Sequence, residues 1–190
     1  LREAVKDYMP KKVNQNPKKT GFNASITDYL NFDDKKIKDQ FLSDNKIFEI
    51  IKKDKIAIIR LDRPKLLNAV NEQLVWDFQK ATEDVKNDND IKVVILTGSG
   101  RGFSAGADLS ERGASWKGSK DALIRGYKPF FKNIIDMPKP VIGSIAGPAA
   151  GIGAAIAMSC DLRIMSDDSY ILSVFSNIAL VPDGGLSWYL

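Results

Sequence analysis

The chain has 190 residues, of which 44% are apolar, and this length predicts one domain or little more. Its 28 Lys and Arg against 24 Asp and Glu leave a net charge of +4, which implies no nucleic-acid partner. Histidine is absent, which excludes Ser-His-Asp and Cys-His catalysis in their usual forms and every metal site that uses His. No apolar run reaches membrane-spanning length and no signal peptide is visible, so we expect no membrane partner.

Residues 1–45 differ in composition from the rest of the chain. They are rich in Lys, Asn and Asp and contain few apolar residues, so we expect an extension or linker that is partly helical at best. The folded domain is predicted for residues 46–190. The chain begins without methionine and stops at "GGLSWYL", so we expect both ends to be cuts in a longer protein.

The first elements of the domain are a predicted hairpin and a predicted helix. The β-rich runs 47–51 and 55–61 flank the charged segment "KKDK", and Pro64 ends the second run. Asn71 is a good N-cap with an acidic residue after it, and apolar side chains follow at helical spacing. These side chains, on one face of the helix, are Leu74, Phe78, Ala81 and Val85.

The rest of the domain alternates between buried strands and helices. A continuous apolar run at 92–97 is typical of a parallel strand that is buried on both faces. The further expected elements are a helix over Leu123, Tyr127, Phe130 and Ile134 that Gly126 and Pro129 weaken or kink, a strand at 140–147, a helix of small apolar residues at 151–160 and a strand at 162–166. This alternation predicts an α/β fold with crossover connections, and no internal sequence repeat is visible.

The single cysteine, Cys160, lies in the apolar run 151–160 and is expected to be a core residue. A lone cysteine cannot form an internal disulfide and fits a reducing compartment, so we expect a cytoplasmic protein. We expect no metal site.

Two loops of small residues, 98–108 and 146–155, each follow a predicted buried strand. The first contains Gly100-x-Gly102-x-x-Ala105, a loose dinucleotide fingerprint, but it neither follows the first strand nor continues into a regular helix. A second interpretation is a pair of tight turns in which small residues pack closely. A third is an oxyanion hole, in which one backbone N–H from each loop, close to a helix start, binds a ligand carbonyl.

Four motifs, in this order and at this spacing, resemble those of the crotonase, or enoyl-CoA hydratase/isomerase, superfamily. They are "LDRPKLLNAV" at 61–70, "GFSAGADL" at 102–109, "VIGSIAGPAAGIGAAIAMSCDLRI" at 141–164 and "FSNIALVPDGG" at 175–185. The resemblance covers residues 46–190. It implies a spiral of ββα turns, an acyl-CoA substrate without a separate cofactor, a homotrimer or hexamer when full length, and a C-terminal helical part that is missing from this chain.

The resemblance also implies a binding site. In the family, the thioester oxygen accepts hydrogen bonds from two backbone N–H groups, which correspond to those of Ala107 and Ile152. The CoA ester is expected to run past residues of three motifs: Lys65, Leu67, Ala69, Ala105, Ala107, Asp108, Leu109 and Gly151. Lys65 is the candidate for contact with the CoA phosphates, and solvation at the surface is its alternative interpretation.

The reaction depends on the acids near this site. The two glutamate positions of the family's hydratases correspond to Ala155 and Phe175, which cannot transfer a proton. Asp183 remains, either as a helix N-cap or as an acid that moves a proton between two carbons. The second role is implied by a resemblance to ring-epoxide isomerases of phenylacetate degradation and Δ3,Δ2-enoyl-CoA isomerases. We expect Asp108 to brace its loop and Asp161 to be structural.

We therefore expect an enoyl-CoA isomerase in which Asp183 is the single acid and base and Ala107 and Ile152 supply the oxyanion hole. The apolar Ala155 and Phe175 would help to exclude water from the site. Two alternatives remain. One is a hydratase-type lyase with altered chemistry, and the other is a member of the family that binds CoA esters without catalysis.

Overall fold

The computed structural model describes residues 48–110 and 116–190. Within the chain, Asn45–Leu190 form one compact unit. The extension expected at residues 1–45 lies outside the described residues.

The larger of two sheets contains the predicted hairpin and three parallel strands. Its strands, in spatial order, are β1 (Phe48–Lys53), β2 (Ile56–Leu61), β3 (Val93–Gly98), β4 (Val141–Ile145) and β6 (Leu162–Met165). β1 and β2 are antiparallel, and each later pair is parallel. Asp54 and Lys55 join the hairpin with positive φ angles of 50° and 67°, as two-residue hairpin loops require. The hairpin and the strand predicted at 92–97 are confirmed.

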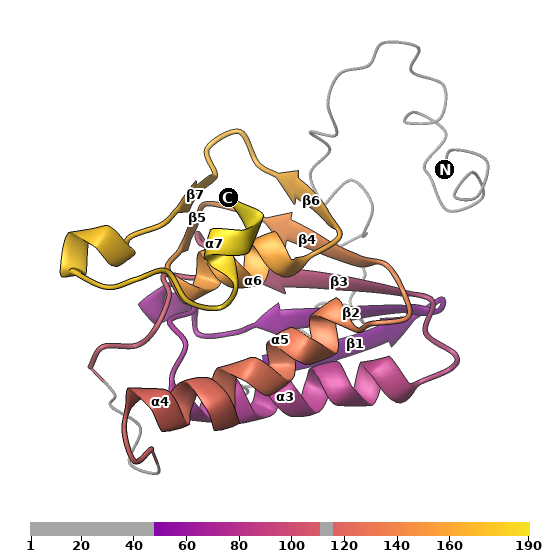
Figure 1. The fold of residues 1–190 in the computed structure, drawn as a ribbon. Helices are drawn as coiled ribbons and strands as arrows, with labels where there is room; N and C mark the ends of the chain where they lie inside the picture. The colour runs from indigo at the N-terminus through magenta and orange to yellow at the C-terminus, as the bar shows by residue number, and fades with distance from the viewer. Residues whose placement is uncertain (1–47, 111–115) are drawn as a thin grey trace. The chain divides into compact units, whose positions relative to one another are not determined.

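The second sheet is built from short pieces that follow the strands of the first. It contains β5 (Pro148–Ala150) and β7 (Tyr170–Leu172), and the bridges Ser104↔Ala149 and Val70↔Ala107 extend it. Each parallel strand of the first sheet is thus followed along the chain by a short extended segment in the second sheet. In most cases a helix follows that segment (Figure 1). This confirms the spiral of ββα turns, although the sequence has no visible repeat.

The helices surround an apolar core. They are α3 (Glu72–Asn87), α4 (Ser119–Asp121), the π-helical η4 (Ala122–Tyr127), α5 (Lys128–Ile135), α6 (Ile152–Ser159), α7 (Leu186–Tyr189) and the 3-10 turns η3 (Pro64–Leu66) and η5 (Phe175–Ile178). α3 and α5 lie side by side (Figure 1), and the ring centroids of Phe78 and Phe130 are 4.9 Å apart. α6 is apolar on every side and buried, as the run of small residues predicts.

Two N-terminal features of these helices follow from single residues. The side chain of Asn71 accepts a 3.0 Å hydrogen bond from the N–H of Leu74, which confirms the predicted cap of α3. Pro129 has no N–H to offer the carbonyl of Arg125. The preceding turn widens, so that the N–H of Lys128 donates to the carbonyl of Leu123. The predicted kink is therefore a π-helical segment.

Asn68 ties the segment after β2 to the loop after β3. Its side chain is fully buried, and its Nδ2 donates to the carbonyls of Ser99 and Gly102 at 2.9 and 2.8 Å. Its Oδ1 accepts from the N–H of Arg63 at 2.8 Å. With a φ of 55°, Asn68 adopts a left-handed conformation that asparagine tolerates better than most residues. One amide group thereby fixes the two connections that lead into the second sheet.

We expect Asn68→Ala to lower the free energy of unfolding by about 3 kcal/mol, because one buried and two partly buried backbone groups lose their partner. Urea unfolding of the full chain measures this change. Asn87→Ala, at the exposed end of α3, is the matched control, with an expected change within about 0.5 kcal/mol. A loss below about 1 kcal/mol for Asn68→Ala would contradict this role.

Candidate active site

The two loops of small residues lie against each other. The N–H groups of Phe103 and Ser104 donate to the carbonyl of Pro148, and the carbonyl of Ser104 accepts from the N–H of Ala150 at 2.9 Å. A Cβ on Gly106 would lie 2.8 Å from the carbonyl oxygen of Ala150, so only glycine fits there. The structure therefore favours close backbone approach, which two of the three interpretations of these loops require.

The backbone N–H of Ala107 points away from its neighbouring strand. Val70 donates to the carbonyl of Gly106 at 2.7 Å and accepts from the N–H of Asp108 at 3.0 Å. Because these bonds flank Ala107, its own N–H faces the opposite side, where Ser104 pairs with β5. Among the described residues, nothing accepts a hydrogen bond from this N–H.

The N–H of Ile152 is the first of helix α6. A first-turn N–H has no partner within its helix, and in the described part of the chain no other acceptor meets it. Gly151, directly before it, has φ 53° and ψ −123°, a conformation that glycine alone adopts readily. A Cβ on Gly151 would lie 3.9 Å from the Cα of Gly106, and a Cβ on Gly106 would lie 3.6 Å from the Cα of Gly151. The loops that carry Ala107 and Ile152 therefore meet at Gly106 and Gly151.

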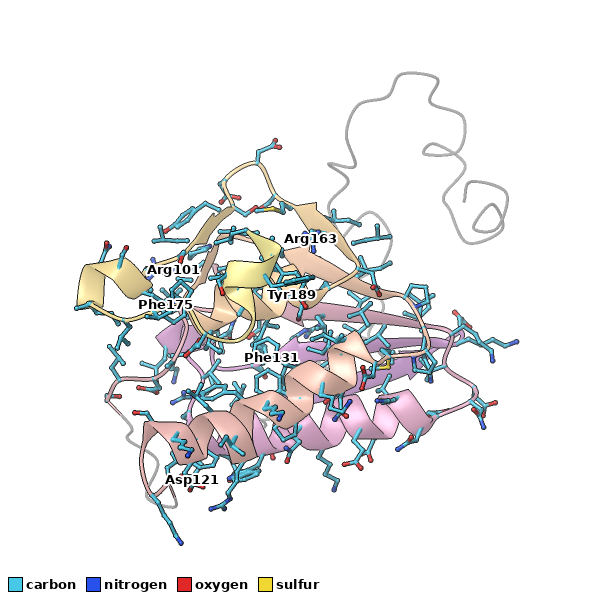
Figure 2. The ribbon with its side chains drawn as sticks, in the orientation of Figure 1. Arg101, Asp121, Phe131, Arg163, Phe175 and Tyr189 are labelled. Atoms are coloured by element: carbon cyan, nitrogen blue, oxygen red, sulfur yellow. The ribbon has the colours of Figure 1, made fainter. Side chains whose placement is uncertain are left out.

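Asp183 lies beside the start of α6. The next residue, Gly184, is packed so closely that a Cβ on it would lie 2.7 Å from the Cβ of Ala155 and 2.9 Å from the Cζ of Phe131. In Figure 2, Phe131 is labelled on α5 and Phe175 at η5. Ala155 and Phe175, which the resemblance matches to the two glutamate positions of the hydratases, are both buried.

The carboxyl group of Asp183 is partly buried and does not cap the helix that follows it. Its Oδ1 is buried and has no hydrogen-bond partner among the described residues. Burial raises its pKa, against a hydrogen bond from its own N–H. α7 begins after Gly185 without a side-chain cap, and the N–H of Leu186 donates to the backbone carbonyl of Asp183. The alternative interpretation of this side chain as an N-cap is therefore wrong.

Tyr127 is a neighbour of Asp183 that the sequence analysis did not single out. Burial, and then the charge of Asp183, raises the pKa of Tyr127 to about 12, so its hydroxyl stays protonated at neutral pH. The only signal in the sequence was a tyrosine at an apolar position of a helical pattern. Its π-helical setting was not predictable from that pattern.

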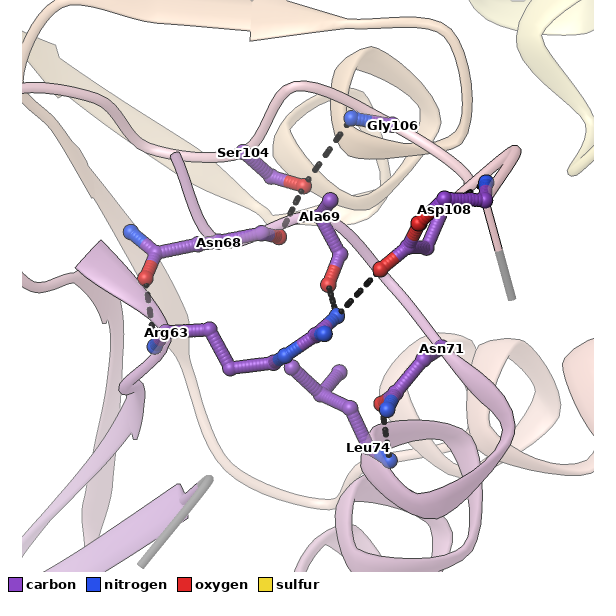
Figure 3. Close-up of polar contacts among 9 residues, drawn as sticks. Arg63, Asn68, Ala69, Asn71, Leu74, Ser104, Gly106 and Asp108 are labelled. Atoms are coloured by element: carbon purple, nitrogen blue, oxygen red, sulfur yellow. Dashed lines mark hydrogen bonds and ion pairs between the residues drawn. The ribbon is translucent and has the colours of Figure 1, made fainter. Parts of the chain in front are cut away.

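The segments expected to contact CoA come together. The N–H of Ala105 donates to the carbonyl of Leu67 at 2.8 Å, and Ala69 and Asp108 both contact Arg63 (Figure 3).

The other residues expected to contact CoA differ in exposure. Lys65 and Leu109 are exposed, and Leu109 shows 77% of its surface to solvent. Gly151, by contrast, is buried and donates its N–H to the carbonyl of Leu172 at 3.0 Å.

Three other reactive side chains have structural roles. Ser104 is buried, donates to the carbonyl of Asn68 and accepts from the N–H of Gly106. Asp161 accepts from the N–H of Val141 at 2.8 Å, as its structural interpretation expects. Cys160 lies in the core, where burial raises the pKa of its thiol to about 12.

Two features are absent from the part of the chain that the structure describes. No three acidic or cysteine side chains gather there in a way that would hold a metal ion. Nor does any helix of this part have the length and apolarity to cross a membrane.

Comparison with known proteins places this geometry in a family. The enoyl-CoA hydratase/isomerase family profile matches residues 51–190. The chain is 34% identical over 139 residues to the 1,2-epoxyphenylacetyl-CoA isomerase of Escherichia coli, covering 71% of this chain and 53% of that protein. It is 39% identical over 137 residues to the short-chain-enoyl-CoA hydratase of Clostridium acetobutylicum, with coverage of 70% and 52%.

The fold matches as well. A crystal structure of an enoyl-CoA hydratase from Mycobacterium avium subsp. paratuberculosis K-10 superposes with a TM-score of 0.66 at 31% identity, covering 75% of this chain and 53% of that one. The chain spans about half the length of the curated relatives it matches. Motifs, fold and family profile agree, and the chain belongs to the enoyl-CoA hydratase/isomerase, or crotonase, family.

Proposed function

We propose that the protein binds acyl-CoA thioesters and polarises the thioester carbonyl with the N–H groups of Ala107 and Ile152. The observation that carries this proposal is the pair of adjoining loops, each of which supplies a backbone N–H without an acceptor among the described residues. Two such donors stabilise the negative charge that develops on the oxygen when the α-proton leaves. CoA is part of the substrate, so no separate cofactor is needed.

We further propose an isomerase in which Asp183 moves a single proton. With a 3-enoyl thioester, the carboxylate removes a proton from C2, and the electron pair moves onto the thioester oxygen as a dienolate. The resulting carboxylic acid returns the proton to C4, and the double bond ends between C2 and C3. The isolated Oδ1 of Asp183 and its raised pKa support this role, because a stronger base suits proton abstraction.

The surroundings of Asp183 favour isomerisation over hydration. A hydratase must position and activate a water molecule, and the side chains of Ala155 and Phe175 cannot do so. Hydration with altered chemistry is the second candidate, because a relative that is 39% identical is named a short-chain-enoyl-CoA hydratase. Assembly as a homotrimer or hexamer when full length is part of the same proposal.

Ala107→Pro tests the oxyanion hole, because proline removes the N–H and Ala107→Ser keeps it. We expect Ala107→Pro to lower kcat by about 10²–10³-fold, the loss typical of one oxyanion donor. The exposed side chain of Ala107 gives serine room, so Ala107→Ser should stay close to wild type. Steady-state kinetics on 3-enoyl-CoA measure this, with urea unfolding as the check on folding. Equal rates in two folded variants would exclude Ala107 as a donor.

Asp183→Asn tests the base. It keeps the size of the side chain and removes its basicity, so isomerase turnover should fall by about 10²–10⁴-fold while CoA-ester affinity is retained. In the wild type, the acidic limb of kcat against pH should lie above the pKa of an exposed aspartate, because burial raises the pKa of Asp183. Turnover that survives in Asp183→Asn would assign the base to another residue.

The same variant has a distinct effect on stability. A carboxyl group whose pKa is raised on folding contributes most below its unfolded pKa, and this contribution is lost as the pH rises through the folded pKa. Asp183→Asn should therefore melt at or above the wild-type temperature at neutral pH, and this advantage should vanish in acid. A large loss of Tm at neutral pH would contradict the assignment.

A further inference from the structure

Arg63 forms a buried ion pair between the two segments of the proposed site. Its Nη1 lies 2.9 Å from Oδ2 of Asp108 and 2.6 Å from the carbonyl oxygen of Ala69 (Figure 3). The side chains of Arg63 and Asp108 are only 12% and 6% exposed. One guanidinium nitrogen therefore joins the segment after β2 to the segment after β3, 45 residues further along the chain.

The ion pair acts on the residue next to the proposed oxyanion donor. Asp108 follows Ala107 directly, and its backbone N–H is held by the carbonyl of Val70. Its Oδ1 accepts from the N–H and the hydroxyl of Ser110 at 3.1 and 2.6 Å. Side chain and backbone of Asp108 are thus both fixed, and with them the peptide that follows Ala107. The peptide that carries the N–H of Ala107 is held through the carbonyl of Gly106, which accepts from the N–H of Val70, the residue directly after Ala69.

A buried ion pair of this kind fixes the relative positions of its two side chains more reliably than it raises the free energy of unfolding. Removing two charges from water offsets much of their attraction, and an apolar pair of similar volume is often as stable. Hydrogen bonds from Ser110 and Arg63 lower the pKa of Asp108, so the carboxylate stays charged at neutral pH. The pair therefore keeps its directional contact under the conditions in which the site works.

We propose that Arg63, through Asp108 and Ala69, is a positioning residue that aims the N–H of Ala107 at the thioester oxygen. The inference rests on the proposed function, since it needs Ala107 to be an oxyanion donor. It also links two roles, because Ala69 belongs to the segment expected to contact CoA. Arg63 itself touches neither the carbonyl nor the transferred proton.

The test reads the oxyanion hole without turnover. A conjugated thioester such as cinnamoyl-CoA absorbs at longer wavelength when hydrogen bonds polarise its carbonyl. Its red shift on binding therefore reports whether the N–H groups of Ala107 and Ile152 point at the carbonyl oxygen. The full chain is compared with Arg63→Met, Arg63→Lys and Asp108→Asn, with titration to saturation. Lys132→Met, which removes an exposed ion pair between α5 and Asp136 directly after it, is the matched control.

We expect wild type and Lys132→Met to give the same red shift and Arg63→Met to lose most of it. Its kcat should fall by about tenfold or more with KM within about threefold, because a small misplacement of a reacting group has a large effect on rate. Asp108→Asn keeps the turn with Ser110 and should lose most of the shift too. Arg63→Lys keeps the positive charge but not the planar, forked guanidinium, so it should show only part of the wild-type red shift.

The outcomes separate the two levels of the proposal. Folded Arg63→Met and Asp108→Asn proteins with the wild-type red shift would overturn the positioning role and leave the proposed function standing. Absence of a red shift in the wild type with bound ligand would overturn the oxyanion hole and the positioning role with it. If Arg63→Met fails to fold, Arg63→Lys and Asp108→Asn carry the same comparison.

Discussion

The close contact between two backbone loops is the constraint on which the rest of this structure depends. The carbonyl of Ser104 and the N–H of Ala150 are 2.9 Å apart, and the positions around them allow no larger side chains at Gly106 or Gly153. Beside this contact, Gly106 and Gly151, the residues directly before Ala107 and Ile152, lie against each other. A site made of backbone donors needs such an approach, because main-chain groups, unlike side chains, cannot reach across a gap.

The chemistry available at this place is simple. The chain has no histidine, and the proposed function assigns this chemistry to the main chain and to one half-buried carboxylate, that of Asp183. The same desolvation that strengthens Asp183 as a base makes its charge unfavourable for the fold. Functional sites often hold ionisable groups in surroundings that shift their pKa and lower the stability of the fold.

Local patterns predicted the individual elements well. The spacing of Leu74, Phe78, Ala81 and Val85 gave α3 its buried face, and Asn71 caps it as expected. Gly126 and Pro129 marked the disturbance that became the π-helical η4. Local patterns did not predict the second sheet, which only the family resemblance implied, since it consists of single bridges and three-residue strands that leave no period in the sequence. The ββα turn repeats in the structure, but no repeat is visible in the sequence.

The sequence by itself determined the element order, the small-residue loops and the family resemblance, and it indicated Asp183 as the candidate acid. These depend on neighbours along the chain, and local sequence reports them. Only the tertiary structure decided that Arg63 pairs with Asp108, that Tyr127 lies near Asp183, and that Asp183 does not cap α7. These contacts join residues 45 or more positions apart or depend on the depth of burial, and both arise only when the ββα turns stack upon one another.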